Sequence, residues 1–351
     1  MIRYILILIV ILIYYITNII SETFIKKNKK KKYIIDEEII NEEIIDEENN
    51  AKLLKKYNKY KNNKYLYFIP KGGINDIFSV LNNLIKYCKN NNRILLLDMN
   101  NSHYNINFSD FFIIKNIDCK IIYDFYKIRD ILSYANKNNL TVYPNNLDFK
   151  LIDLLNKKIN IKTKYIKRFN SHIYKNIRFN LPNNKNEFIL FYLNNNGGNG
   201  FLFFKNLFLT DNIKKLCKKK MALLKPNYLC IHIRNTDYKS NFQKLYKDNM
   251  KYIDSFKQIY ICTDDKLVLD YFKFDLRLNV YSFTTFPNRN RYHNLHYSKD
   301  ISPTTKMQDL IIDIFMATNS KNILSNSRGG FTRLLKNCFN NKKIILDKLK
   351  S

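Results

Sequence analysis

The chain has 351 residues, of which 46% are hydrophobic and 15% aromatic, enough for two domains with buried cores and too apolar for a disordered protein. A formal net charge of +30 would favour a nucleic-acid or membrane-surface partner. However, Lys, Asn and Ile are enriched together, as a nucleotide bias in the coding sequence would produce, and no recognition helix or basic patch with interleaved aromatics is evident. We therefore expect no nucleic-acid partner.

The cysteines are far apart in the sequence and form no CxxC pair; they are Cys88, Cys119, Cys217, Cys230, Cys262 and Cys338. Several of them lie within apolar runs, which is typical of small buried side chains. This spacing predicts neither a zinc site nor a disulfide framework, and it leaves the cellular compartment open.

An almost wholly apolar run covers residues 4–20 and is interrupted only by Thr17 and Asn18. At about 1.5 Å per residue, this run nearly crosses the hydrocarbon core of a bilayer. No small-residue cleavage site follows it, so we predict a single-pass transmembrane anchor over residues 1–23 rather than a cleaved signal peptide. Its orientation stays open: the lysines of 26–32 would keep the body of the protein in the cytosol by the positive-inside rule, but lysine is abundant throughout.

A charged segment separates the apolar run from the first folded part. Residues 36–48 are mostly acidic, with isoleucine pairs at 39–40 and 44–45, a spacing that fits neither a strand nor a heptad repeat. Residues 24–63 are therefore predicted to be a stem.

The folded part opens with a strand, a glycine turn, a helix and a second strand. The apolar run 64–70 is followed by Gly72 and Gly73, a helical pattern over 77–88 and another apolar run over 93–99. The chain contains seven glycines in all, so a pair at this position is informative. It suits a phosphate at a helix N-terminus, where N–H groups and a partial positive charge point outward. A tight turn without a ligand remains the alternative, because the spacing is neither GxGxxG nor a P-loop.

Short strands and helices alternate from there to residue 225 without a recognisable motif. Expected strands lie at 120–123, 140–143 and 188–193, and a helix falls within 203–224. His103 and His172 stand alone in polar loops, and we assign them no role. We place the domain boundary in this region, with one Rossmann-like domain over 64–200 and a second over 201–351.

The stretch around residue 234 carries the strongest indication of chemistry. A short apolar run over 228–233 predicts a buried parallel strand, and it ends in His232, Arg234 and Asp237. Open α/β sheets bind ligands at the carboxyl ends of their strands. An ordinary strand leading into a polar loop is the alternative.

In two later stretches, polar or small residues also follow a predicted strand. A strand over 258–263 ends in Asp264 and Asp265, and another over 279–283 precedes a predicted helix at 308–318. The Ser- and Gly-rich turn 325–330 then separates a strand from a helix, which makes a second corner that suits an anion. The two glycine corners and Arg234 together form a predicted diphosphate cradle.

These segments resemble the three ordered motifs of the GDP-fucose-dependent fucosyltransferases. The motifs are His232–Asp237, Thr263–Asp265 and the pair Asp309–Asp313 with Ser325–Phe331. The pattern is most similar to the α1,6-fucosyltransferase branch, which includes core N-glycan and nodulation-factor enzymes. Gly72–Asn75 is similar to the glycine-rich first loop of the superfamily. The resemblance covers about residues 65–340.

The resemblance implies a GT-B architecture, in which two Rossmann-like domains face each other across a cleft. It implies an enzyme that transfers fucose from GDP-fucose to a glycan or glycoprotein, and for an anchored member a place in the secretory pathway (ER or Golgi). Arg234 would contact the β-phosphate and act in catalysis with Asp237 as a candidate general base. The implied substrate-binding residues are Gly72, Gly73, Asn75, His232, Asp264, Asp265, Asp313, Ser325, Ser327, Gly329 and Gly330.

The chemistry of sugar transfer accounts for these residue types. Breaking a sugar–diphosphate bond leaves negative charge on the phosphate, which an arginine and oriented N–H groups stabilise. No Asp-x-Asp triplet is present near the motifs, and adjacent carboxylates at a strand end point in opposite directions, so we predict metal-independent catalysis without a cofactor. The sequence departs from the branch at Asn235, where its members carry a second arginine. A degenerate protein that binds a GDP-sugar or a glycan without transferring is the alternative function, followed by a basic protein that binds nucleic acid or membrane surfaces.

Overall fold

The computed structural model describes residues 60–143, 147, 150–155, 187–192, 198–236, 238–287, 295 and 298–350. From Asn63 onward they form one compact unit. The predicted anchor at 1–23 and nearly all of the predicted stem lie outside the described residues. Within the part that is described, no helix combines the length and apolar character needed to cross a membrane.

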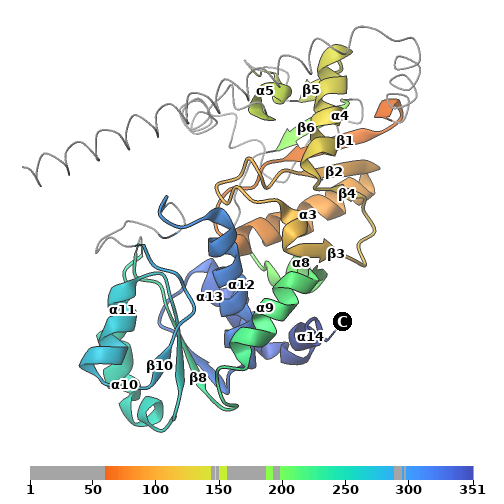
Figure 1. Ribbon diagram of the computed structural model, residues 1–351. Helices are drawn as coiled ribbons and strands as arrows, with labels where there is room; N and C mark the ends of the chain where they lie inside the picture. Colours follow the sequence, from red (N-terminus) through yellow and green to blue (C-terminus); the bar gives the residue numbers. More distant parts are fainter. Residues whose placement is uncertain are drawn as a thin grey trace, which may run out of the picture. The chain divides into compact units, whose positions relative to one another are not determined.

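The first sheet has five parallel strands in the order β4-β2-β1-β6-β5 (Figure 1). Its strands are β1 (Lys64–Phe68), β2 (Arg93–Leu97), β4 (Ile121–Ile122), β5 (Val142–Tyr143) and β6 (Ile189–Tyr192). Strands β1 and β2 are almost continuously apolar and buried, as expected where helices cover both faces of a parallel sheet.

The second sheet has four parallel strands in the order β10-β9-β8-β11. They are β8 (Leu229–Ile233), β9 (Ile259–Thr263), β10 (Val280–Tyr281) and β11 (Asn322–Leu324). Two parallel sheets in one chain confirm the predicted α/β class and are consistent with a GT-B fold.

Each sheet has one point where the strand order reverses. In the first sheet this point lies between β1 and β6, and in the second between β8 and β11. Loops that leave such neighbouring strands run in opposite directions and open a crevice at the carboxyl edge, where α/β proteins bind ligands. Gly72 and Gly73 follow β1, Arg234 follows β8, and Ser325 follows β11. The predicted residues therefore lie at both reversal points.

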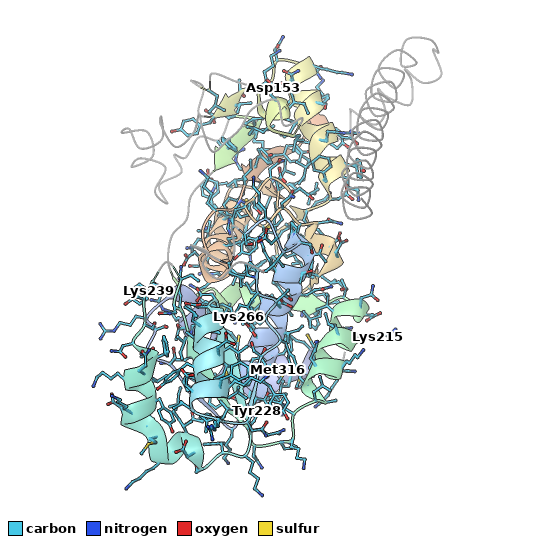
Figure 2. The ribbon with its side chains drawn as sticks, turned by 60° about the vertical axis from the view of Figure 1, so that its left-hand side comes forward. Asp153, Lys215, Tyr228, Lys239, Lys266 and Met316 are labelled. Carbon is cyan, nitrogen blue, oxygen red and sulfur yellow. The ribbon has the colours of Figure 1, made fainter. Side chains whose placement is uncertain are left out.

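The connections between strands are mostly helical. The described helices are α3 (Ile74–Asn90), α4 (Phe125–Lys137), α5 (Leu151–Leu155), α8 (Phe201–Phe204), α9 (Asp211–Met221), α10 (Phe242–Asp254), α11 (Lys266–Asp270), α12 (Pro303–Asn319), α13 (Gly330–Asn340) and α14 (Lys342–Asp347), with a 3-10 turn at Phe108–Asp110 and a π-turn at Tyr271–Asp275. Helices α12 and α13 pack against each other, and α13 also packs against α3 (Figure 1). Tyr228 ties β8 to α12 by donating to the carbonyl of Met316 at 2.6 Å; both residues are labelled in Figure 2.

Helix α3 begins three residues earlier than the sequence pattern predicts. Its apolar side chains at positions 74, 77, 78, 81, 84 and 88 recur at helical spacing and are buried. Gly73 is the N-cap, so the glycine pair leads directly into the helix rather than into a loop. The predicted anion corner is thus a helix N-terminus.

A short antiparallel ladder joins distant parts of the chain. Strand β3 (Phe112–Ile114) pairs with β7 (Leu207–Leu209), and one continuous apolar core includes residues of both parallel sheets. Because residues from Asn63 onward form one compact unit, the domain boundary near residue 200 stays a prediction.

Candidate active site

The carboxyl ends of both sheets face a common pocket of about 300 Å³, at the lower end of the range for small-molecule sites. Most of the predicted site residues line it: Gly72, Gly73, Asn75, His232, Arg234, Asp264, Asp313 and Gly330. Asp265, Ser325, Ser327 and Gly329 are described but do not belong to this lining.

The N-termini of α3 and α13 converge at this pocket. Their N-caps are Gly73 and Gly329, and neither end has a side-chain cap. A Cβ atom on Gly330 would lie 3.0 Å from Asn75 Nδ2 and 3.1 Å from Asp76 Oδ1, so the two helix starts nearly touch. Two helix N-termini without side-chain caps that meet at one pocket suit an anion.

Arg234 lies beside this pair of helix ends. Its backbone N–H donates to Ser327 Oγ at 3.0 Å, which fixes the residue where β8 ends. A Cβ atom on Gly329 would lie 3.4 Å from Arg234 Nη1, so the guanidinium passes over that glycine. A Cβ atom at this position would make only ordinary contact with the arginine side chain.

Two serines from the predicted motif support the site rather than line the pocket. Ser327 Oγ accepts from Arg234 and also lies 2.9 Å from Ser240 Oγ. Ser325 Oγ lies 3.2 Å from His232 Nδ1 and accepts from the Ser327 N–H at 3.2 Å. These hydroxyls join the loop after β11 to the end of β8.

His232 lines the pocket as a neutral imidazole. Its Nδ1 lies 3.2 Å from both Ser325 Oγ and Thr332 Oγ1, and its ring packs edge-on against Phe331. Burial, with a smaller contribution from Arg234, lowers the pKa of His232 to about 3. His232 therefore gives or accepts hydrogen bonds but does not act as a base near neutral pH.

Asp313 is buried on α12. Its Oδ1 accepts from the Tyr260 hydroxyl at 2.5 Å, and its Oδ2 lies 3.4 Å from Thr284 Oγ1. Burial raises the pKa of Asp313 to about 7 in spite of these donors. Near neutral pH this carboxyl group can thus either donate or accept a proton.

The adjacent acidic residues after β9 differ in their surroundings. Asp264 lines the pocket and accepts from the Asn235 N–H at 2.7 Å and from Thr236 Oγ1 at 2.6 Å. Asp265 caps α11 through the Leu267 N–H at 3.0 Å and accepts from Asn235 Nδ2 at 2.9 Å. The predicted contact of Asp265 with substrate stays a prediction, but its bonds hold the 235 loop in place.

The resemblance implies a second arginine at position 235, where this chain has Asn235. The Asn235 side chain makes its hydrogen bonds within the protein. In addition to its bonds with the two aspartates, its Oδ1 accepts from the Ser240 N–H at 3.2 Å and its carbonyl accepts from Lys239 Nζ at 2.7 Å; Lys239 is labelled in Figure 2. The amide therefore folds the loop after β8, a role that a guanidinium at this position would not reproduce.

Asn75 is buried at the start of α3 and joins the two sides of the first reversal point. It donates to the Gly198 carbonyl at 3.0 Å and accepts from the Gly200 N–H at 3.1 Å. Arg333 of α13 donates to the same Gly198 carbonyl at 3.1 Å. The loop after β6 is thereby tied to both helix starts.

Asp237, the predicted catalytic base, lies outside the described residues. Among the residues that the structure does describe, no cluster of three or more His, Cys, Asp or Glu side chains is arranged to hold a metal ion. Metal-independent catalysis stays a prediction.

Several pocket residues were given no role from the sequence: His103, Tyr104, Thr285, Lys306 and Asp309, although Asp309 begins one of the resembling motifs. Asp309 lies one helical turn before Asp313 and accepts from the Thr285 N–H at 2.7 Å; burial raises its pKa. Lys306 donates to the Ser298 carbonyl, and burial lowers its pKa. The position of His103, shortly after the apolar run of β2, was the signal that could have identified it.

Comparison with known proteins finds similar folds among solved structures. No family model matches the sequence, and no match is found among curated proteins. Among solved structures, NodZ α-1,6-fucosyltransferase co-crystallized with GDP matches with 16% identity and a TM-score of 0.53, over 79% of this chain and 92% of that chain. Fucosyltransferase NodZ from Bradyrhizobium matches with 15% identity and a TM-score of 0.50, over 79% and 93% of the two chains.

The fold is that of a GDP-fucose-dependent fucosyltransferase. A structure of the same enzyme soaked with GDP-fucose matches with 16% identity and a TM-score of 0.50, over 78% of this chain and 92% of that chain. At these identities the likeness concerns the fucosyltransferase fold alone.

Proposed function

We propose that this protein is a glycosyltransferase that moves a sugar, with fucose as the first candidate, from a GDP-sugar to a glycan or glycoprotein. The resemblance of its motifs, the fucosyltransferase fold and the position of the pocket support this proposal. The GDP and GDP-fucose of the NodZ structures suggest the donor class.

One observation carries the proposal. Arg234 lies beside the converging N-termini of α3 and α13, where negative charge on a leaving diphosphate would meet one guanidinium and two sets of N–H groups. A charge-assisted contact of this kind contributes about 1.5–3 kcal/mol. The transition state requires that contribution most, because the leaving group gains charge as the sugar departs.

The experiment is a binding titration of GDP, UDP and CDP against the wild type and Arg234→Ala. We expect GDP to bind with preference, and Arg234→Ala to weaken binding by about 10- to 100-fold. Arg129→Ala is the matched control, since Arg129 is exposed on α4 over the ring of Tyr126. Unchanged GDP affinity in folded Arg234→Ala would contradict the proposal. Transfer that is resistant to EDTA would support metal independence.

A second candidate is a protein that binds a GDP-sugar without transferring it. The observation in its favour is Asn235, whose amide is taken up by loop contacts where the resemblance implies an arginine. This candidate predicts GDP binding with no consumption of GDP-fucose. Release of GDP from GDP-fucose, above the rate without protein, would exclude it.

We also propose that residues 4–20 anchor the protein in a membrane of the secretory pathway, on the basis of their apolar sequence. The full chain should stay with membranes during alkaline carbonate extraction, and a chain lacking residues 1–23 should be released. Release of the full chain would count against the anchor.

A further inference from the structure

We propose that Cys88 and Cys119 form a disulfide bond in an oxidising environment, and that this bond fastens the edge strand β4 to helix α3. Neither cysteine lines the pocket, so the proposal is independent of the proposed function. The spacing of the cysteines predicts no disulfide framework, because a single bond between positions far apart in the sequence leaves no local pattern.

The two thiols are in contact. Cys88 lies in the last turn of α3 and is fully buried in the core that also contains Leu95 and Leu97 of β2. Cys119 precedes β4, is half-buried and packs against the same core. A hydrogen bond joins the two side chains, and both are free thiols in the structure. Helix α3 packs against β2, which pairs with β4 (Figure 1), so the contact joins neighbouring elements.

The residues next to the cysteines hold the two segments side by side. Lys89, which follows the helical cysteine directly, has its Nζ 2.7 Å from Oδ2 of Asp118, the residue before Cys119. On the other side of Cys119, the Lys120 carbonyl accepts from the Leu95 N–H of β2 at 3.0 Å. Cys119 therefore lies between one residue that is paired with α3 and one that is bonded to β2.

Cys119 is the thiol that meets an external oxidant first. Its Sγ donates to the Lys120 carbonyl at 3.6 Å and to the Arg93 carbonyl at 3.8 Å, two weak contacts that hold the side chain beside the backbone. The hydrogen bond with Cys88 lowers the pKa of Cys119, whereas this bond and burial raise the pKa of Cys88. The half-buried thiol thus ionises more readily, and the thiolate is the reactive form.

The bond forms by thiol–disulfide exchange with a small disulfide such as oxidised glutathione. The Cys119 thiolate attacks one sulfur of this oxidant, which gives a mixed disulfide and releases one small thiolate. Cys88 then gives up its proton and attacks the Cys119 sulfur, which releases the second small thiolate. Two electrons pass from the cysteines to the oxidant, and the two cysteine protons leave with the two small thiols. Cys88 needs no access to solvent, because its only reaction partner is Cys119.

Strand β4 has little else to hold it. It contains two residues, Ile121–Ile122, and as the edge of the first sheet it pairs with β2 alone. The Lys89–Asp118 ion pair beside it is exposed, and such pairs contribute little stability. A disulfide would close a loop that contains β2 and would stabilise the fold by restricting the unfolded chain. Such bonds persist in oxidising compartments, which the proposed anchor in the secretory pathway would provide.

The test equilibrates the purified full chain with increasing ratios of oxidised to reduced glutathione, followed by alkylation under denaturing conditions. Peptide mass spectrometry should find Cys88 linked to Cys119 and the other cysteines alkylated. Thermal unfolding should show the oxidised form melting about 5–10 °C above the reduced form, the shift expected for a loop of this length in a chain of this size.

Three variants serve as controls. Cys119→Ser, which keeps a donor beside the Lys120 carbonyl, and Cys88→Ala should each melt at the same temperature in both buffers. Cys217→Ala, which removes a buried cysteine of α9, should keep the shift of the wild type.

Several results would overturn the proposal. One is a mixed disulfide between Cys119 and glutathione that persists without linkage to Cys88, since it would show that the second thiol cannot reach the first. Linkage of either residue to another cysteine would also contradict it, as would an oxidised form that melts no higher than the reduced form. A shift that survives in Cys119→Ser would assign the effect to other thiols. None of these results depends on whether the protein binds GDP.

Discussion

His232 and Asp313 titrate in opposite directions within one pocket. Burial holds the pKa of His232 at about 3, below its ordinary 6.5, and raises the pKa of Asp313 to about 7 from 3.8. As pH falls from 7 to 4, the folded state gains stability at Asp313, which takes up a proton earlier than it does in the unfolded chain. Over the same range the fold loses stability at His232, which would be protonated in the unfolded chain only.

We therefore predict that Asp313→Asn makes the protein more sensitive to acid. In this variant the fold no longer gains stability from proton uptake by Asp313 as the pH falls, but it still loses stability because His232 is protonated only in the unfolded chain. Its free energy of unfolding should therefore drop more steeply between pH 7 and pH 4.5 than that of the wild type. Urea unfolding at both pH values measures this, with Asp248→Asn on the exposed face of α10 as control. Parallel pH dependence of wild type and variant would contradict the assignment.

Gly200 is required by a close approach rather than by an unusual backbone angle. A Cβ atom there would lie 2.5 Å from the Asn75 carbonyl oxygen and 2.9 Å from Asn75 Oδ1. We predict that Gly200→Ala lowers the free energy of unfolding by about 1–3 kcal/mol, because the backbone has to shift. Gly73→Ala is the matched control: its nearest neighbour would be 3.9 Å away, and the expected cost is below about 1 kcal/mol. Equal costs in urea unfolding would refute the explanation.

Residue type and position predicted that Arg234 and the two glycine corners lie together, and Gly72, Gly73, Arg234 and Gly330 do line one pocket. An arginine at a strand end and glycines before a helix each suit an anion, and their function as a binding site stays a prediction. Residue type and position could not separate Asp264 from Asp265, since which side chain faces a pocket depends on the twist of the strand end. The place of His103 in the pocket lining was missed for a related reason: whether a histidine in a polar loop lines a pocket depends on which distant segments close the space in front of it.

Helix α11 depends on one side chain at its start. Asp265 caps the Leu267 N–H and also accepts from Asn235 Nδ2. We predict that Asp265→Ala lowers the free energy of unfolding by about 1–3 kcal/mol, because an N-cap and a buried acceptor are lost together. Asp265→Asn, which keeps an acceptor oxygen, should cost less. Equal losses in thermal or urea unfolding would show that the cap matters little.

Helices and strands with a clear local hydrophobic pattern were predicted well, whereas short strands that form only through long-range pairing were not. The strands β1, β2, β8 and β9 and the helices α3 and α12 follow apolar runs of clear period. Strands β3 and β7 are three residues each and pair across a long separation in sequence. Nothing within so short a segment distinguishes a strand from an apolar turn.

At the scale of the whole molecule, the last helix is fastened to an earlier part of the chain by Lys348. Its Nζ donates to the carbonyls of Lys205 at 2.6 Å and Leu207 at 2.5 Å, and it lies 4.7 Å from the ring centroid of Phe208. Burial lowers the pKa of Lys348 to about 8. Among 60 Lys and Arg residues, no sequence pattern marks this lysine as buried.

The lowered pKa predicts an effect at alkaline pH. Between about pH 8 and pH 10.5 the unfolded chain keeps the proton that folded Lys348 releases, so the folded state gains stability as pH rises. Relative to Lys348→Met, the wild type should gain on the order of 2 kcal/mol between pH 8 and pH 9.5. Urea unfolding of both proteins measures this difference, with exposed Lys350→Met as control. A difference that does not change with pH would contradict the buried charge.

The convergence of α3 and α13 bears on synthesis in the cell. The ribosome adds about 5–20 residues per second, so the amino-terminal glycine corner emerges well before its partner at Gly329–Gly330. A nascent chain therefore holds only one wall of the pocket for most of its translation. A ligand that needs both corners cannot guide early folding, so the chain must reach its final arrangement through packing alone.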